Sequence, residues 1–476
     1  MAEENTKQRH YISTFVLAMM NVACVMSLRG LPMMAKEGLT MFFYLAFAAL
    51  LFLVPVSLIS AELASGWPQG GGVYRWVREA FGSRWGFTAI WLQWIQNVIW
   101  YPTVLAFAAG ALSYFFINPA LDTNKTFNIA VILIVYWGAT FMNFCGMKTT
   151  GRLTTIGLLA GTIFPAVLII ALGILWIVTG NPIQLDTASG NFLPNFADFS
   201  SVAFLGGIVL LFAGMEVGAV HVRELRNPKV QYTKAVFLAM LIIVVVFVLG
   251  SLSVAVVIPE KSISLTAGIM QGFKELLDKF SMGWFLPIMG LLVAFGAVGG
   301  VIAWIAGPSK GLLATAKDGD LPPFLQYTNK HGVQTHILWI QGAIVTIISL
   351  VYLLMPTISS AFFILTALTA ILYIIMYILL YASAIKLRYS QPDVHRTYKV
   401  PGGNFGMWIV AGIGMLAVVF AMIVGFFPPS QLTVGSPTFY VSFLIVGIIV
   451  FVGAPLIINV LKRPEWMPKE NSQTEE

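Results

Sequence analysis

Twelve long apolar runs follow one another along the chain, and they constrain its fold more than any other feature. About 20 apolar residues in a helix cover the roughly 30 Å hydrocarbon core of a bilayer. Each run is continuous, whereas the strands of a transmembrane barrel alternate apolar and polar residues. We therefore predict an all-α membrane protein with twelve transmembrane helices at residues 11–34, 41–63, 85–117, 127–145, 153–178, 201–220, 235–258, 283–306, 336–355, 361–385, 407–427 and 438–461.

The distribution of basic residues predicts the orientation of these spans. With this assignment 21 Lys and Arg residues lie on one side of the membrane and five on the other, and Arg29 lies inside a span. Cytoplasmic loops carry the excess of Lys and Arg. We therefore expect an inner-membrane protein with cytoplasmic tails at residues 1–10 and 462–476. The first ten residues are polar and charged, which does not fit a signal peptide.

Arg29 interrupts the first apolar run and is followed by Gly30 and Pro32. A central arginine costs about 2.5–3.5 kcal/mol on translocon scales, and both following residues weaken a helix. An opened backbone in a bilayer is tolerated only where it faces protein or a water-filled cavity. We interpret residues 25–32 as a substrate-binding break in the helix. The alternative is a kinked helix whose Arg29 reaches the membrane interface.

A second break is predicted in the sixth run, where Gly214 and Gly218 flank Glu216. This buried charge sits at the same point of its run as Arg29 does in the first run. Interrupted segments at matching positions of two halves point to the binding site of a secondary transporter. The alternative is that Glu216 forms a structural ion pair with Arg29 or with Arg223.

The order of the spans predicts an inverted repeat. The first run begins in the cytoplasm and the sixth begins outside, so two five-helix units at residues 11–178 and 201–385 have opposite topology. The loop at residues 179–199 is a natural hinge between them, and residues 407–461 form two peripheral helices.

Opened half-helices offer free N–H groups to a carboxylate and free carbonyls to an ammonium group, which suits a zwitterionic amino acid. We expect the first break to hold the substrate carboxylate and the second to hold its amine. Arg29 and Glu216 would then select the side chain or form a gate. The predicted binding residues in the two breaks are Ser27, Leu28, Arg29, Gly30, Phe212, Ala213, Gly214, Met215 and Glu216.

Polar residues on two further spans are candidates for the substrate path. Gln93, Gln96 and Asn97 share one helical face of the third span, and Tyr373 and Tyr377 share a face of the tenth. Polar amides in a membrane prefer the bundle interior. They either line the path or bond to neighbouring helices.

Several other classes of function are poorly supported. The five histidines fall near span ends or in loops, and no nucleophile–base pair or metal-ligand spacing emerges, so we expect no enzyme, no metal and no cofactor. The basic residues follow the membrane topology, which argues against a nucleic-acid partner. Residues 293–306 contain no Ser, Thr, Asp or Asn, so the eighth span offers no side-chain oxygen to a hard cation. We expect sodium-independent transport.

A set of short motifs carries a family resemblance over nearly the whole chain. They are Ala61-Glu62-Leu63, Gly70-Gly71-Gly72-Val73-Tyr74-Arg75-Trp76, Gly214-Met215-Glu216, Arg223-Glu224-Leu225-Arg226-Asn227-Pro228, Ala303-Trp304-Ile305-Ala306-Gly307-Pro308 and Arg396-Thr397-Tyr398-Lys399-Val400-Pro401. In this order the chain resembles the amino acid–polyamine–organocation transporters, and within them the glutamate/γ-aminobutyrate antiporter branch.

The resemblance implies a leucine-transporter-type fold of five plus five inverted helices with broken first and sixth helices. It also implies alternating access around a midplane site, usually with exchange of one amino acid for another or for its decarboxylation product. Trp304 matches an aromatic residue that closes over substrate in this branch; the alternative is a packing tryptophan near a span end. The tail after Leu461 is too short for the plug of acid-resistance members. A member of this branch has an acidic residue near the position that Arg29 occupies here.

The predicted function is therefore sodium-independent amino acid antiport across the lipid bilayer. One alternative is a proton-coupled symporter with Glu216 or Glu62 in the proton path, and a more distant one is an amino acid sensor on the same scaffold. The sequence predicts neither the substrate nor the oligomeric state.

Overall fold

The computed structural model describes residues 12–68, 71–186, 191–219, 221 and 225–467. Helices and turns make up this part of the chain, and no strand occurs in it. The α-helices are α1 Thr14–Val25, α2 Leu31–Ala35, α3 Met41–Phe47, α4 Val54–Gly66, α5 Val73–Phe81, α6 Ser83–Phe115, α7 Lys125–Phe144, α8 Met147–Leu158, α9 Phe164–Val178, α10 Leu205–Leu211, α11 Met215–Gly218, α12 Pro228–Ala255, α13 Gly268–Lys279, α14 Leu286–Lys317, α15 Thr335–Ser349, α16 Val351–Leu354, α17 Ile358–Ser390, α18 Gly403–Gly425 and α19 Pro437–Val460.

Short helical turns connect or interrupt these elements. Two are π-helical and continue a span, namely η3 Ala48–Leu53 and η5 Leu159–Ile163. The 3₁₀ turns are η1 Leu28–Gly30, η2 Gly38–Thr40, η4 Pro119–Thr123, η6 Phe199–Val202, η8 Glu260–Ser262, η9 Gly283–Phe285, η10 Pro323–Gln326 and η11 Pro464–Trp466.

Twelve membrane spans are present when the bent first pair is counted as one. Eleven helical segments are long and apolar enough to cross a bilayer, and α1 together with residues 28–35 forms the twelfth, bent by 51°. The prediction of an all-α protein with twelve spans is confirmed. The division into inverted repeats stays a prediction.

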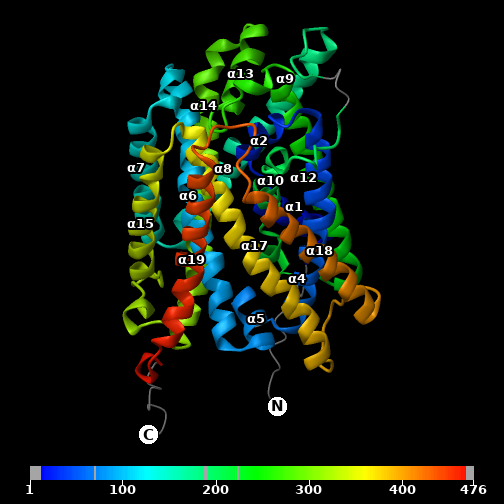
Figure 1. Ribbon diagram of the computed structural model, residues 1–476, viewed down its shortest axis with the longest axis vertical. Coiled ribbons are helices and arrows are strands. Elements are labelled where there is room, and N and C mark those ends of the chain that lie inside the picture. The colour runs from blue at the N-terminus through cyan, green and yellow to red at the C-terminus, as the bar shows by residue number, and fades with distance from the viewer. Residues whose placement is uncertain (1–11, 69–70, 187–190, 220, 222–224, 468–476) are drawn as a thin grey trace, which may run out of the picture.

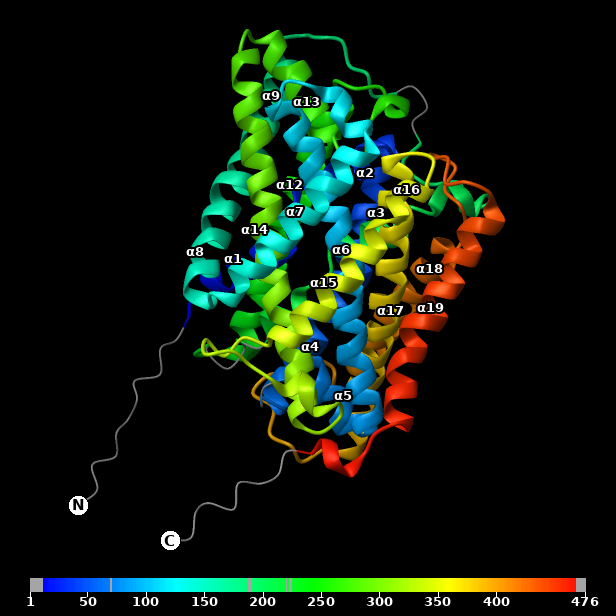
Figure 2. The same ribbon diagram turned by 90° about the vertical axis from the view of Figure 1, so that its left-hand side faces the viewer.

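The two ends of the bundle are distinguished by short helices (Figure 1). We call the end that carries α5 and the last turn of α19 the lower face, and the end that carries α13 the upper face. Figure 2 shows α18 and α19 together on one flank of the bundle, and α7 beside α15 in agreement with Figure 1.

The two 33-residue helices α6 and α17 form the most enclosed part of the bundle, because most of their side chains are buried by other helices. Helix α19 is the opposite case: only three of its residues are buried, and most of its exposed residues are apolar, as a lipid-facing helix requires.

The eighth span is longer than predicted. The sequence Gly307-Pro308 suggested an end near residue 306, but α14 continues to Lys317. Proline removes one backbone hydrogen bond from a helix. The helix nevertheless continues through Pro308, and in this turn the hydroxyl of Ser309 donates to the carbonyls of Ile305 and Ala306.

Candidate functional site

A cavity of about 690 Å³ lies in the centre of the bundle, between the two breaks. Helices α6, α14 and α17 complete its wall. Ten of the predicted site and path residues line it: Ser27, Leu28, Arg29, Gln93, Gln96, Asn97, Ala213, Glu216, Trp304 and Tyr373. The other five, Gly30, Phe212, Gly214, Met215 and Tyr377, lie behind this wall.

The cavity reaches toward the lower face. Its lining includes Gly71 and Gly72 before α5, and Lys310 in the last two turns of α14. Gly71 and Gly72 directly precede α5, which lies at the lower face (Figure 1). The cavity therefore extends from the breaks toward the lower face.

The first break separates α1 from η1. Helix α1 ends at Val25, and Met26 and Ser27 are extended, with ψ angles of 122° and 134°. The hydroxyl of Ser27 accepts the N–H of Arg29 at 3.4 Å, which starts the short turn. A helix that ends in this way leaves the carbonyls of its last turn without intrahelical partners. Polar backbone therefore meets the cavity here.

Arg29 is buried in this break without a carboxylate partner. Its side chain is 3% exposed, and its Nη1 donates to the Thr103 hydroxyl at 3.1 Å. The guanidinium carbon lies 5.7 Å from the ring centre of Trp100 and 5.4 Å from that of Phe362. The buried Nε has no hydrogen-bond partner. The alternative in which Arg29 reaches the membrane interface is wrong.

Gly30 brings the two broken spans into contact. A Cβ atom at this position would overlap the side chain of Leu211, the last residue of α10. A residue with a side chain at position 30 would require the end of the Leu211 side chain to shift, so the two breaks approach each other closely at this glycine.

The second break runs from Phe212 to Gly214. Gly214 has a φ of 115°, a conformation that glycine adopts without strain. A Cβ atom at Gly214 would lie 3.4 Å from the carbonyl oxygen of Cys24 and 3.5 Å from the Trp304 ring. The second break thus packs directly on the end of α1 and on α14.

Glu216 is held by neutral donors. Its Oε1 accepts hydrogen bonds from the Tyr373 hydroxyl and, at 3.3 Å, from the Gln93 amide, and its Oε2 accepts one from Tyr377 at 2.9 Å. The N–H of Gly214 donates to the Tyr377 hydroxyl at 3.3 Å. Glu216 therefore fixes the second break to α6 and α17.

The predicted alternative of an ion pair between Arg29 and Glu216 is not formed. Neither residue has an oppositely charged side chain within 4.0 Å in the described part of the chain. The other predicted partner, Arg223, lies outside the described residues. The two central charges are thus separate features with different partners.

The three amides of α6 divide into two roles. Gln93 reaches Glu216, whereas Gln96 and Asn97 donate to the Gln93 carbonyl at 3.1 and 2.8 Å. All three line the cavity. Trp304 also lines it, with its ring 6.2 Å from that of Trp100. Because α14 continues well beyond it, Trp304 does not lie at a span end as its alternative required.

Sequence reasoning missed the residues that surround Arg29. Thr103 and Phe362 were not predicted, although Pro102 beside Thr103 marks a local opening of α6. It also missed Cys24, which lines the cavity in the last turn of α1, directly before the first break. The second cysteine, Cys145, is exposed.

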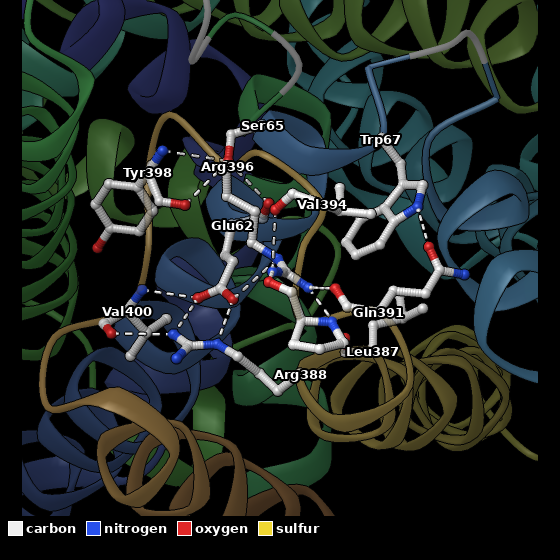
Figure 3. Close-up of polar contacts among 11 residues, drawn as sticks. Glu62, Ser65, Trp67, Leu387, Arg388, Gln391, Val394, Arg396, Tyr398 and Val400 are labelled. Atoms are coloured by element: carbon white, nitrogen blue, oxygen red, sulfur yellow. Dashed lines mark hydrogen bonds and ion pairs between the residues drawn. The ribbon is translucent and has the colours of Figure 1, made fainter.

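Glu62 does not belong to the cavity, which weakens its predicted role in a proton path. It is buried near the lower face, where Arg388 binds it through two hydrogen bonds of 2.5 and 2.6 Å (Figure 3). The N–H of Val400 donates to it at 2.7 Å, and Arg396 lies 3.5 Å away. This network ties α4 to the end of α17 and to the loop that follows.

No group of three or more His, Cys, Asp or Glu side chains suited to a metal ion occurs among the described residues. The wall formed by residues 293–306 of α14 is built from apolar and glycine residues.

Comparisons with known proteins agree with this architecture. A family model described as amino acid permease matches residues 11–451. An uncharacterized transporter of Legionella pneumophila is 43% identical over 444 residues, which is 93% of this chain and 95% of that protein. The glutamate/gamma-aminobutyrate antiporter of Lactococcus lactis is 34% identical over 94% of this chain and 90% of its own length. A probable agmatine/putrescine antiporter of the same species is 24% identical over 88% of each. The chain therefore belongs to the amino acid permease family of membrane transporters.

Proposed function

We propose that the protein is a sodium-independent antiporter that exchanges an amino acid with an acidic side chain for a second amino acid or its decarboxylation product. Buried Arg29, which lines the cavity without a carboxylate of its own, carries this proposal. The name of the Lactococcus lactis relative supports it, since that protein is a glutamate/gamma-aminobutyrate antiporter.

The two breaks supply the groups that every amino acid needs. The backbone around Ser27 and Leu28 would hold the α-carboxylate, and carbonyls near Ala213 would hold the α-amine; all three residues line the cavity. Backbone groups of this kind bind any amino acid alike. Selectivity must therefore come from side chains.

Arg29 is the side chain that would select the substrate. An unpaired buried cation is costly, and a carboxylate that binds it with two hydrogen bonds removes much of this penalty. In the described chain only the Thr103 hydroxyl accepts a hydrogen bond from its guanidinium group. A substrate with a second carboxylate would supply the missing counter-ion.

The distribution of Lys and Arg residues supports an orientation of the protein in the membrane. The lower face carries the basic residues of α5 and of the ends of α14 and α17, including Arg75, Arg78, Lys317 and Arg388. We propose that this face is cytoplasmic, in an inner membrane. The cavity would then be open to the cytoplasm.

A counterflow screen tests the function. Proteoliposomes are loaded with one unlabelled amino acid, and uptake of a labelled one is measured across all twenty amino acids and common amines. We expect fast uptake of glutamate or aspartate only when a substrate is inside, unchanged when choline replaces sodium. Uptake into empty vesicles driven by a pH gradient would identify a symporter instead. Binding without counterflow would identify a sensor.

A further inference from the structure

A cluster of polar residues closes the bundle at the upper face, opposite the open end of the cavity. Glu37 lies in the turn between α2 and η2 and is partly buried. Its Oε1 accepts a hydrogen bond from the Gln431 amide at 2.9 Å, and its Oε2 accepts one from the Thr40 hydroxyl at 3.3 Å. Gln431 belongs to the loop between α18 and α19, which is far from Glu37 in the sequence.

The same amide nitrogen of Gln431 also donates to the carbonyl of Ser201 at 3.1 Å. Ser201 lies in η6, which leads into α10, and it accepts a second hydrogen bond from Tyr44 at 3.1 Å. The N–H of Ser430 donates to the Ser200 carbonyl at 3.1 Å. Gln431 therefore joins the outer ends of the two broken spans.

This junction is coupled to the breaks through short, tightly packed segments. Helix α2 has only five residues between Gly30 and Lys36. A Cβ atom at Gly268 of α13 would lie 2.7 Å from Pro32, so α2 is packed closely at the upper face. One short, closely packed helix thus joins the turn at Glu37 to the segment that carries Arg29.

The charges near Glu37 come from three elements. Lys36 precedes it and donates to the Glu260 carbonyl at 3.0 Å. The Glu260 carboxylate packs on Gly38, and Asp186 acts on Glu260 in turn. The segments that carry Gln431 and Tyr44 contribute no other charge to Glu37.

These surroundings favour the protonated form of Glu37. Burial, with a smaller contribution from Glu260, raises the pKa of Glu37 from 4.5 to about 8, and the hydrogen bonds and Lys36 oppose this rise. Burial also raises the pKa of Glu260, where Asp186 adds to the effect, and lowers the pKa of Lys36.

We propose that Glu37, Gln431 and Ser201 form a proton-operated latch that holds the upper face closed while the cavity is open to the lower face. Loss of the Glu37 proton leaves a charged carboxylate in a buried place, with the Glu260 carboxylate nearby. This cost exceeds the gain in the hydrogen bonds that Glu37 accepts, so the closed arrangement weakens. The latch rests on alternating access, and thus on the proposed function, but it requires no particular substrate.

The direction of the pH effect follows from the linkage between proton binding and the latched state. A carboxyl group whose pKa is higher in the latched state binds its proton more tightly there, so acidity at the upper face favours that state. Between pH 4.5, the ordinary pKa, and about pH 8, the raised pKa, Glu37 is protonated in the latched state and ionised in the open state. The latched-to-open ratio therefore depends on pH in this interval. The ratio should rise about tenfold from pH 9 to pH 7.

Labelling of Cys24 tests the latch, because this thiol lines the cavity. The exposed Cys145 is first replaced by serine. Vesicles with the lower face outward receive a membrane-impermeant maleimide at fixed outer pH, while the inner pH, which bathes the upper face, is set between 6 and 9. We expect the labelling rate of Cys24 to fall up to tenfold as the inner pH rises from 7 to 9.

Variants separate the latch from other titrating groups. Glu37→Gln, which cannot ionise, should label fast at every inner pH, and Gln431→Ala, which loses the bridge, should label slowly at every inner pH. Glu275→Gln, at an exposed carboxylate of α13 on the same face, should behave like the wild type. A flat wild-type profile, or a Glu37→Gln profile that follows the wild type, would overturn the proposal.

Counterflow measured against the pH at the upper face gives a second readout. The wild type should show a midpoint near pH 8 that Glu37→Gln lacks, and identical profiles would contradict the latch. A protein that shows the Cys24 response but no counterflow with any amino acid would retain the latch and refute the proposed antiport.

Discussion

Two arginines are buried in this bundle with opposite surroundings. Arg388 is 8% exposed and binds Glu62 through two hydrogen bonds (Figure 3). Arg29 is 3% exposed and lies between the rings of Trp100 and Phe362, with no carboxylate within 4.0 Å in the described chain. A buried charge needs a partner. Arg388 has its partner within the fold, whereas we propose that a ligand brings the partner of Arg29.

Glu216 is a second charge at the cavity, and its hydrogen bonds come from the protein itself. Its two oxygens accept hydrogen bonds from Tyr373, Tyr377 and Gln93. Hydrogen bonds to a charged group are each worth about 1.5–3 kcal/mol. Glu216 accepts three hydrogen bonds, whereas Nε of Arg29 has no partner in the described chain. From this contrast we propose that Glu216 supports the architecture and that Arg29 selects the substrate.

The largest effect is expected at the paired arginine. Glu62→Ala leaves Arg388 buried without its carboxylate, and breaking a buried pair costs about 3–5 kcal/mol of stability. The Tm of the purified transporter should fall strongly. Glu79→Ala, at a partly exposed i,i+4 pair with Arg75 on the same face, is the control and should change the Tm little. Equal shifts in the two variants would contradict the structural role of the Arg388 pair.

Replacement of the unpaired Arg29 should affect the Tm in the opposite direction. Arg29→Met replaces a cation that lacks a counter-ion by an apolar side chain of similar length, a change of about 1–4 kcal/mol toward stability by analogy with buried charges elsewhere. We expect an unchanged or higher Tm, together with loss of acidic amino acid counterflow. A Tm that falls as far as in Glu62→Ala would mean that Arg29 is structural.

A smaller change sharpens the role of the guanidinium group. Arg29→Lys keeps the charge but loses the planar fork that binds a carboxylate through two hydrogen bonds. The KM for acidic amino acids should rise about tenfold, a loss of about 1.4 kcal/mol, while neutral substrates change less. Counterflow of acidic and of neutral amino acids, measured in parallel, tests this prediction. An equal loss for both would mean that Arg29 does not contact the substrate side chain.

The smallest effect on selectivity is expected at the hydrogen bonds that support Glu216. Tyr377→Phe removes one hydrogen bond to the carboxylate and the acceptor for the Gly214 N–H. Tyr373 and Gln93 remain, so we expect a loss of about 1–3 kcal/mol in stability and an equal reduction of acidic and neutral transport. Selective loss of acidic transport would reverse the roles assigned to Arg29 and Glu216.

The spans and both breaks could be predicted because they depend on local sequence. Apolar length defines a span, and Gly30, Pro32 and Gly214 mark where a helix opens whatever lies around it. The same local reasoning placed the end of α14 too early, because a Gly-Pro pair can also lie inside a continuous helix, as Pro308 does in α14.

The partners of the charges could not be predicted. Arg29 meets Thr103 across 74 positions of sequence, and Glu62 meets Arg388 across 326. Which face of a helix meets which neighbour depends on the rotation of each helix in the packed bundle. The sequence therefore left open whether Arg29 and Glu216 pair with each other, whereas the fold gave each a different set of contacts.

Equilibrium binding of a matched pair of ligands tests the central claim most directly. Glutamate and glutamine have nearly the same shape and differ in the side-chain charge that Arg29 would bind. Calorimetry on the purified wild type should show glutamate bound at least tenfold more tightly than glutamine, and Arg29→Met should abolish that preference. A preference for glutamate that survives in Arg29→Met would contradict the assignment of Arg29 as the selecting residue.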